Sequence, residues 1–421
     1  MTPTQPIDLD RSASSPVVVL GWKPTEVLQW LSSFGADVVC VCEPQDLAAV
    51  EASGLVSRAV VAPSVADAAE VLAALVRARV VTPDTTVCTA DEFPLVTASI
   101  VGEALGCRSW PVRLALSLRD KFVQKELIRA AGLPVAQAHR VDRLSDLDQV
   151  PFQGPYVVKP FDQVGARLTA VVQDAAQAAL FAERSGAPDL GPGPWLVESF
   201  VAGRELHVDG VVRAGELQFI SVSRYLNNVM DFRDGGLIGS TAQDPDEFPE
   251  LYRRATETTT RALAALGHRD GVFHLELFEQ EQDLVFGECA GRVGGGRVDT
   301  VVQLKFGVDL HEEWARAVFG LPSAAAGGKR DRRSFGMLHL PAVAGRITAL
   351  PSPQEIRERP GVEAVEMKFG VGDVVADTGK DSNARFGRAV VSGKDTAEAE
   401  QRLRALADWF RAGVQVEPVR D

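Results

Sequence analysis

Four short apolar runs divide the first hundred residues, and the segments between them show the periodicity of amphipathic helices. The runs are Val17–Leu20, Val38–Cys42, Ala59–Val61 and Thr86–Cys88. Because strands alternate with helices, the pattern predicts a parallel sheet with helices on its faces. The first strand is not followed by GxGxxG, so the fingerprint of dinucleotide-binding folds is absent.

The middle of the chain predicts one long helix and then strands that end in charged residues. Leu116–Ala131 has a helical pattern that stops at Gly132–Pro134. Two later apolar runs end in Lys159 and in Glu198. Further strand patterns cover Glu205–Val212 and Leu217–Ser223.

Two segments lack this regularity. Arg224–Asp246 is polar and contains glycines, which suits a substrate-lining loop on a rigid scaffold, and a disordered surface insertion is the alternative. Ser323–Arg333 is small, glycine-containing and charged, so it is the best candidate for a linker. The tail after it mixes short strands with a closing amphipathic helix over Ala397–Phe410.

A glutamate lies inside each of two neighbouring apolar runs, Val272–Phe278 and Leu284–Cys289. The segment that joins the runs is wholly polar, so a β-hairpin is the simplest interpretation. An acid inside an apolar strand indicates a specific role, because burying an unpaired charge is unfavourable.

The expected register places Glu276 and Glu288 on one face of this hairpin. With Glu281 at the centre of the turn, Glu276 pairs with Phe286. Glu288 then pairs with His274, and the two glutamates are diagonal neighbours that can converge on one cation. Oxygen ligands at this density suit magnesium. The alternative is that one or both glutamates point to solvent, because a slip of one residue reverses the face.

Composition limits the classes of protein that the chain can represent. Its 421 residues exceed the size of a single core and predict two or three domains. Hydrophobic residues at 46% and charged residues at 24% are ordinary for a globular protein. The net charge of −13, without a basic stripe, argues against nonspecific binding to nucleic acid.

The sequence predicts a cytoplasmic protein with no membrane partner. The first sixteen residues are polar, and no apolar run reaches the roughly eighteen residues that a membrane span needs. The cysteines are odd in number and lie mostly in apolar runs, which favours reduced, buried thiols over disulfides or a zinc site. They are Cys40, Cys42, Cys88, Cys107 and Cys289.

Seven short motifs follow one another along the middle of the chain. They are Arg119–Lys121, Ala131–Pro134, Val157–Pro160, Val197–Glu205, Phe273–Glu276, Gly287–Arg292 and Gly307–Leu310. In this order and spacing they resemble the ATP-grasp superfamily. More narrowly, the chain resembles its carboxylate–amine ligases, the group that contains the L-amino-acid ligases that make dipeptides. The resemblance covers residues 91–321 well and is fainter outside them.

The resemblance implies an ATP-grasp fold, classed as α/β and α+β. A flexible N-terminus over residues 1–15 precedes an N-terminal parallel α/β domain over 16–113. The central ATP-grasp region spans 114–322, with a smaller lid lobe at about 140–200. The linker then covers 323–333, and a C-terminal α+β domain covers 334–421.

The resemblance also implies the cofactors ATP and Mg²⁺, with Mn²⁺ as a candidate substitute. The candidate ATP contacts are Lys121, Lys159, Glu198, Phe200, Val201 and Glu205. The lysines would meet phosphates and Glu205 the ribose hydroxyls, although exposed surface charges are the common alternative. The candidate metal ligands are Glu276 and Glu288, and the candidate catalytic residue is Arg292, which would stabilise the transferring phosphoryl group or hold the substrate carboxylate. Candidate substrate contacts are His274, Gly295 and Arg297, and a satisfied core histidine is the alternative for His274.

Two positions depart from the family pattern. Many members have Asn two residues after the second metal glutamate, where this chain has Ala290. The segment Phe161–Arg167 would cover the phosphates, but it offers a single glycine, and Arg167 is a candidate replacement cation.

The implied reaction is an ADP-forming ligation. ATP activates an amino-acid-like carboxylate as an acyl phosphate, and an amine, from an amino acid or a peptide, attacks it to form an amide. The partners are therefore small-molecule carboxylates and amines, and a homodimer is the candidate assembly. The alternatives are a biotin-carboxylase-like enzyme that acts on bicarbonate and an ATP-binding protein without turnover.

Overall fold

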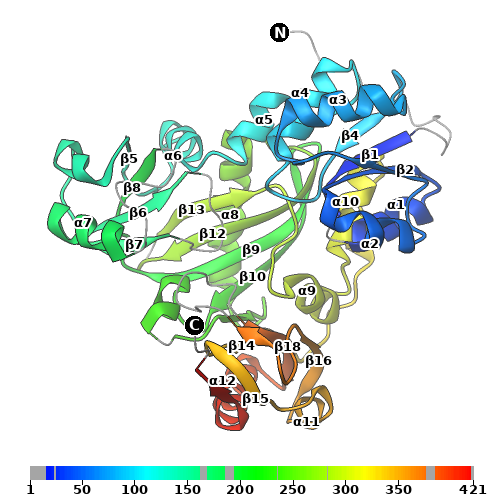
Figure 1. The fold of residues 1–421 in the computed structure, drawn as a ribbon. Coiled ribbons are helices and arrows are strands. Elements are labelled where there is room, and N and C mark those ends of the chain that lie inside the picture. The colour runs from blue at the N-terminus through cyan, green and yellow to red at the C-terminus, as the bar shows by residue number, and fades with distance from the viewer. Residues whose placement is uncertain are drawn as a thin grey trace.

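The computed structural model describes residues 16–418 apart from 23–24, 162–167, 185–193, 235, 282 and 376–384. Its strands form four sheets, with helices packed on them (Figure 1). The combination of a parallel N-terminal sheet with antiparallel sheets confirms the predicted mixture of α/β and α+β parts. The flexible stretch predicted for 1–15 and most of the predicted phosphate-covering loop lie outside the described residues.

The N-terminal sheet is parallel, in the order β3-β2-β1-β4, as the βαβ pattern predicts. Its strands are β1 (Pro16–Leu20), β2 (Asp37–Cys42), β3 (Arg58–Val61) and β4 (Thr86–Cys88). Helices α3 (Ala68–Ala78) and α4 (Leu95–Ala104) pack on one face. The other face packs on α1 (Thr25–Ser33) and on α10 (Leu310–Val318) of the central region. A 3-10 helix (Pro44–Asp46) and α2 (Leu47–Ala52) complete this part.

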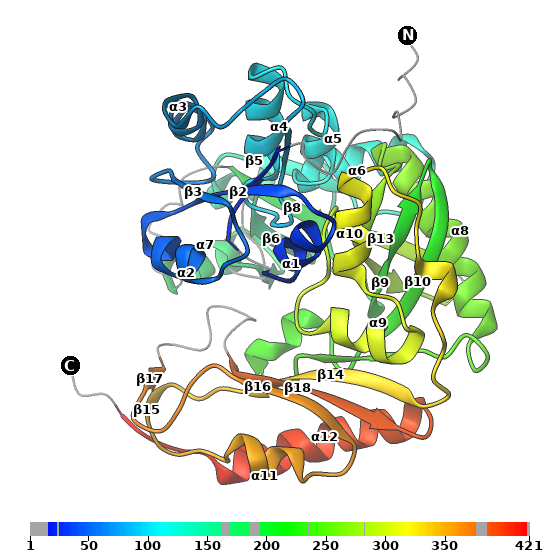
Figure 2. The same cartoon turned by 90° about the vertical axis from the view of Figure 1, so that its right-hand side faces the viewer.

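One antiparallel sheet runs through the central and C-terminal parts, in the order β13-β12-β9-β10-β11-β14-β18-β16. Its strands are β9 (Arg204–Arg213), β10 (Glu216–Tyr225), β11 (Gly239–Ala242), β12 (Gly271–Glu279), β13 (Leu284–Ala290), β14 (Ser334–Pro341), β16 (Val362–Met367) and β18 (Arg385–Gly393). Strand β14 pairs with β11, so the chain after the predicted linker continues the central sheet. Figure 2 shows β14, β16 and β18 together with α11 and α12 below the strands of the central region. The predicted domain boundaries themselves stay a prediction.

Helices cover both faces of the central strands. On one face lie α5 (Val112–Ser117), α6 (Lys121–Ala130) and α8 (Pro249–Leu266). On the other face, α9 (Val298–Phe306) and α10 pack on Val211 and Val272. Helix α12 (Thr396–Gly413) packs on the C-terminal strands, near α11 (Pro353–Arg357).

A separate antiparallel sheet, here called the lid sheet, has the order β5-β8-β6-β7. Its strands are β5 (Ala138–Val141), β6 (Tyr156–Pro160), β7 (Ala170–Val172) and β8 (Trp195–Ser199). Helix α7 (Ala175–Arg184) and a 3-10 helix (Leu144–Gln149) pack on it. A small sheet joins β15 (Gly345–Ala349), β17 (Val374–Val375) and β19 (Gln415–Glu417). Among the described residues, no helix has the length and apolar character that crossing a bilayer requires.

The long helix predicted over Leu116–Ala131 is wrong, because the structure contains two helices there. Helix α5 ends at Ser117 and α6 begins at Lys121. Between them, the Asp120 side chain accepts hydrogen bonds from the backbone N–H groups of Phe122 and Val123 at 2.9 and 3.0 Å. An aspartate in this position satisfies the free donors of a helix start, so it begins a new helix instead of continuing the old one.

The irregular segment predicted over Arg224–Asp246 contains regular structure. It includes a 3-10 helix (Val229–Asp234) and strand β11, which pairs with β10 and β14. Long-range pairing explains why the strand was not predicted, because Gly239–Ala242 carries little apolar pattern of its own. Residues 228–231 of this segment line a cavity, and a contact of the segment with substrate stays a prediction.

The cap of α6 predicts a measurable loss of stability. Asp120→Ala removes the acceptor for two backbone donors and should lower the free energy of unfolding by about 1 kcal/mol. Asp120→Asn keeps a capping oxygen and should lose much less. Urea unfolding of the two variants checks this, and an equal loss in both would show that the cap is not the cause.

Candidate active site

A cavity of about 450 Å³ lies between the lid sheet and the β12–β13 hairpin. The structure brings all the predicted nucleotide contacts and both predicted metal ligands to its lining. These residues are Lys121, Lys159, Glu198, Phe200, Val201, Glu205, Glu276 and Glu288. They come from both sheets and from the start of α6, and their individual roles stay predictions.

Ion pairs link the lysines of the cavity to its glutamates. Lys121 Nζ lies 3.3 Å from Glu288 Oε2. Lys159 Nζ and Lys125 Nζ lie 3.1 and 3.4 Å from the two carboxylate oxygens of Glu198. Burial favours a higher pKa for Glu198, but the two ammonium groups outweigh it and lower that pKa below its ordinary value. Glu198 is therefore held as a carboxylate between two cations.

Sequence reasoning missed Lys125, which is only 2% exposed. It follows Lys121 by one helical turn, so both side chains leave the same face of α6. The spacing of four residues between the two lysines was the signal in the sequence that could have identified Lys125. Burial lowers the pKa of Lys125, and the neighbouring Glu198 opposes this shift. Its Nζ also donates to the carbonyl oxygen of Phe286 at 3.4 Å.

The hairpin has a different register from the one predicted. Glu276 lies directly opposite Glu288, so the predicted pairs, Glu276 with Phe286 and Glu288 with His274, are wrong. Gly287 is an extra residue at this point of β13, a bulge that shifts the register by one. A Cβ atom on Gly287 would come within 2.9 Å of the Glu276 carbonyl oxygen, so glycine allows the close approach. The two carboxylates still share one face.

The paired glutamates fit a hard divalent cation. Their side chains are 23% and 33% exposed and line the cavity. Burial works to raise the pKa of Glu288, but Lys121 and Lys159 outweigh it and hold that pKa at about 2. The hydroxyl of Tyr225 donates to Glu276 at 3.3 Å. Two adjacent carboxylates with further oxygen ligands from a substrate are a typical donor set for such a cation.

Glu205 is a buried acid on β9. Its Oε2 accepts a hydrogen bond from the backbone N–H of Val229 at 2.6 Å. Burial and the neighbouring Glu276 raise its pKa to about 8. The ribose contact predicted for Glu205 stays a prediction. Phe200, which is 43% exposed, and Val201 follow β8 at the edge of the same cavity.

Arg292, the predicted catalytic residue, lies outside this cavity lining and pairs with a buried carboxylate. Its Nη2 and Nε lie 2.6 and 2.9 Å from Glu92 Oε2. Arg119 Nη1 lies 3.6 Å from the other oxygen of Glu92. Sequence reasoning missed Glu92, because it is separated from Arg292 by two hundred residues and the loop after β4 carries no motif. The pair fixes the direction of the Arg292 guanidinium.

A chain of polar side chains lies next to the loop Gly291–Gly296, here called the glycine-rich loop. Asp209 Oδ1 is 2.8 Å from His274 Nδ1, and Asp209 Oδ2 is 2.5 Å from His207 Nδ1. His274 Nε2 points towards Glu276 at 3.7 Å. Burial opposes protonation, but Asp209 outweighs it and raises the pKa of His274 to about 10. The ligand atoms of His207, Asp209 and His274 lie close enough together to hold a metal ion. Hydrogen bonds already join both imidazoles to Asp209, however.

Sequence reasoning missed His207 and Asp209, although their spacing on β9 places both on one face of the strand. The substrate contact predicted for His274 stays a prediction. A Cβ atom on Gly294 would lie 2.6 Å from Asp209 Oδ1, whereas one on Gly295 would meet open space. Arg297 has a φ of 83° and lies 3.7 Å from Glu366 of β16.

Comparisons with known proteins relate the chain to ligases. Residues 338–415 match a family model described as L-amino acid ligase C-terminal domain 2. The chain is 26% identical over 297 residues to the L-arginine-specific L-amino acid ligase of Bacillus subtilis. This match covers 68% of this chain and 69% of that protein. It is 33% identical over 151 residues to the D-alanine–D-alanine ligase of Ruegeria pomeroyi. This match covers 36% of this chain and 47% of that protein.

A solved structure of an L-amino acid ligase from Bacillus licheniformis is similar over almost the whole chain. The TM-score is 0.76 at 18% identity, and the match covers 96% of this chain and 99% of that chain. At this identity the likeness shows the fold.

The pKa of Glu205 predicts how its contribution to stability changes with pH. Because that pKa is raised from 4.5 to about 8, the folded state binds the proton more tightly than the unfolded chain does. The resulting stabilisation is present at low pH and is lost as pH rises through this window. Urea unfolding without nucleotide should show the difference between wild type and Glu205→Gln falling as pH increases. A difference that does not change with pH would contradict a buried acid.

Proposed function

We propose that this chain, a member of the ATP-grasp superfamily from its carboxylate–amine ligase group, is an ADP-forming ligase. It would activate an amino-acid-like carboxylate as an acyl phosphate and join it to the amine of an amino acid or a peptide. The observation that carries the proposal is the convergence in one cavity of buried lysines and of two glutamates paired across a hairpin. The match of residues 338–415 favours this reaction over the alternatives of bicarbonate activation and of binding without turnover.

We assign the cavity between the lid sheet and the hairpin to ATP. Lys121 and Lys159 supply compact positive charge for the phosphates. Glu205 is placed to accept hydrogen bonds from ribose hydroxyls, as a buried acceptor on the cavity wall. Phe200 and Val201 offer an apolar edge for the base. Lys125 has a positioning role, because its ammonium group forms an ion pair with Glu198.

We assign Mg²⁺, with Mn²⁺ as a candidate substitute, to Glu276 and Glu288. When bound, this ion neutralises phosphate charge and orients the terminal phosphoryl group. The chain's own residues prepare its site. The Gly287 bulge sets the glutamates opposite each other, and Lys121 keeps Glu288 ionised.

The reaction proceeds in two transfers. The substrate carboxylate attacks the terminal phosphorus of ATP, and ADP leaves. The amine then attacks the acyl carbon, phosphate leaves and the amine nitrogen loses a proton. Negative charge spreads over the phosphoryl oxygens during transfer, and the Arg292 guanidinium, directed by Glu92, is a suitable cation to stabilise it. The lid sheet would exclude water, which otherwise hydrolyses the acyl phosphate.

The five cysteines are free, which supports the predicted cytoplasmic location. The homodimer stays a prediction that light scattering can measure.

The proposal is tested by incubating the protein with Mg²⁺-ATP and pairs of L-amino acids. We expect phosphate release that depends on both amino acids, and products with the mass of the two minus one water. Release with bicarbonate alone would favour the carboxylase alternative. ATP binding without release across a broad panel would favour the binding protein.

Glu288→Gln keeps the shape of the side chain but removes its charge. We expect phosphate release to fall by at least about a hundredfold, since a major electrostatic contribution to the transition state is lost. Glu281→Gln, in the exposed loop of the same hairpin, is the matched control and should be unchanged. Near-normal turnover of Glu288→Gln would remove this residue from the metal site.

Arg292→Lys keeps the charge but loses the planar guanidinium that Glu92 orients. We expect kcat to fall by at least about tenfold, with little change in the KM for ATP, because the contact matters most in the transition state. A raised KM for ATP at unchanged kcat would instead place Arg292 in ground-state nucleotide binding.

A further inference from the structure

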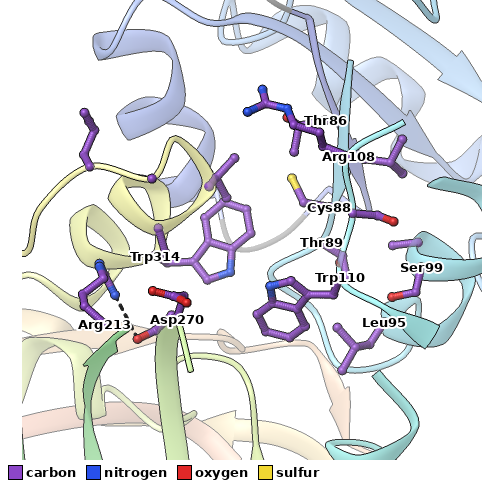
Figure 3. A pocket seen from close by; sticks show the side chains of 18 residues that line it. Thr86, Cys88, Thr89, Leu95, Ser99, Arg108, Trp110, Arg213, Asp270 and Trp314 are labelled. Atoms are coloured by element: carbon purple, nitrogen blue, oxygen red, sulfur yellow. Dashed lines mark hydrogen bonds between the residues drawn. The ribbon is translucent and has the colours of Figure 1, made fainter. Parts of the chain in front are cut away.

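A second cavity, of about 300 Å³, lies between the N-terminal sheet and the central region. Strand β4 and helix α4 line one side, and helix α10 lines the other (Figure 3). None of the residues that line it belongs to the lining of the nucleotide cavity. Its size is at the lower end of the range of small-molecule sites.

Two indole rings form the main walls of this cavity. Figure 3 shows Trp314 of α10 and Trp110 facing the space from opposite elements, with Leu95 beside Trp110. Val87 and Val318 add to the apolar surface. Such walls favour a ligand with an aromatic or branched apolar body.

Three residues that line the cavity each have a buried polar side-chain atom without a partner among the described residues. Thr86 Oγ1, Arg108 Nε and Arg213 Nε are buried and have no hydrogen-bond partner in the described part of the chain. Thr86 and Arg108 are neighbours, because a parallel β-bridge joins them. The two arginine nitrogens can only donate and the Thr86 hydroxyl can also donate, so a hydrogen-bond acceptor would satisfy all three groups.

The charges of the cavity differ between its ends. Arg213 Nη2 is neutralised by Glu313 at 2.8 Å. Arg108 forms no ion pair with any residue that the structure describes. Figure 3 shows Arg108 and Thr86 together, away from Arg213 and Asp270. The acceptor is therefore expected to be an anion held by Arg108 and Thr86.

We propose that this cavity is a second ligand site for a small carboxylate with an aromatic or branched apolar body. Its carboxylate would bind Arg108 and Thr86, and its apolar body would lie between Trp110 and Trp314. Apolar amino acids and short apolar peptides share this chemistry. If the proposed ligase activity holds, these are its own substrates and products, and the site would sense one of them.

The site has a physical route to the reacting groups. A Cβ atom on Gly291 would come within 2.8 Å of the Trp110 ring, so this indole rests directly on the backbone that carries Arg292. Leu95, which lines the cavity, begins α4 three residues after Glu92, the partner of Arg292. A ligand that fixes Trp110 would therefore also restrict the Glu92–Arg292 pair.

Calorimetry with 3-phenylpropanoate tests the site without requiring turnover, so its result is independent of the ligase proposal. We expect saturable binding at one site per chain that saturating Mg²⁺-ATP does not displace. Arg108→Gln should weaken binding by at least about tenfold, because a charge-assisted contact is lost. Arg113→Gln, an exposed arginine outside the cavity lining, is the matched control and should bind like wild type.

Ser99→Phe should abolish binding by filling the cavity from α4, with circular dichroism to establish that the variant is folded. If this variant does not fold, Arg108→Gln decides alone. Absence of saturable binding to wild type, displacement by ATP, or unchanged affinity in Arg108→Gln would overturn the proposal.

Competition identifies the source of the carboxylate. Displacement of 3-phenylpropanoate by L-leucine at lower concentration than by L-leucyl-L-leucine assigns the site to a free amino acid, and the reverse order assigns it to a peptide. Failure of both to displace the probe would overturn the assignment to this class. Phosphate-release assays on the same samples report separately on the ligase activity.

Discussion

Negative charge that is buried in a narrow cavity is the constraint on which the candidate active site depends. Glu198, Glu205, Glu276 and Glu288 all line the space between the lid sheet and the hairpin. Like charges at this spacing disfavour ionisation unless cations compensate them. The lysines of α6 and β6 compensate Glu198 and Glu288, whereas burial and the neighbouring Glu276 raise the pKa of Glu205. This arrangement suits the proposed uptake of a divalent cation together with a nucleotide.

Three elements of the fold, α6, the lid sheet and the β12–β13 hairpin, supply the charges that compensate one another in this cavity. The Asp120 cap starts α6 at the point where Lys121 and Lys125 reach the cavity. The lid sheet brings Lys159 to the same carboxylate that Lys125 contacts. The bulge at Gly287 brings the hairpin carboxylates face to face. Each element therefore supplies a charge that a residue of another element compensates.

The N-terminal part of the chain contacts the loop of the central region that carries Arg292. Glu92, which follows β4, holds the Arg292 guanidinium. Trp110 rests on Gly291 and also forms a wall of the second cavity. The interface between these parts therefore packs on the glycine-rich loop, and a ligand in the proposed second site would lie beside it.

The sequence by itself determined the elements whose signals are local. It predicted the parallel N-terminal sheet, the hairpin with both glutamates on one face, and, through its ordered motifs, an ATP-grasp fold that the comparisons confirm. Tertiary structure decided the rest. Glu92 and Arg292 meet across two hundred residues, and β11 becomes regular only by pairing with β14. The Gly287 bulge likewise depends on how β13 pairs with β12. Such features depend on which strands and loops become neighbours, and no short window of the sequence contains that information.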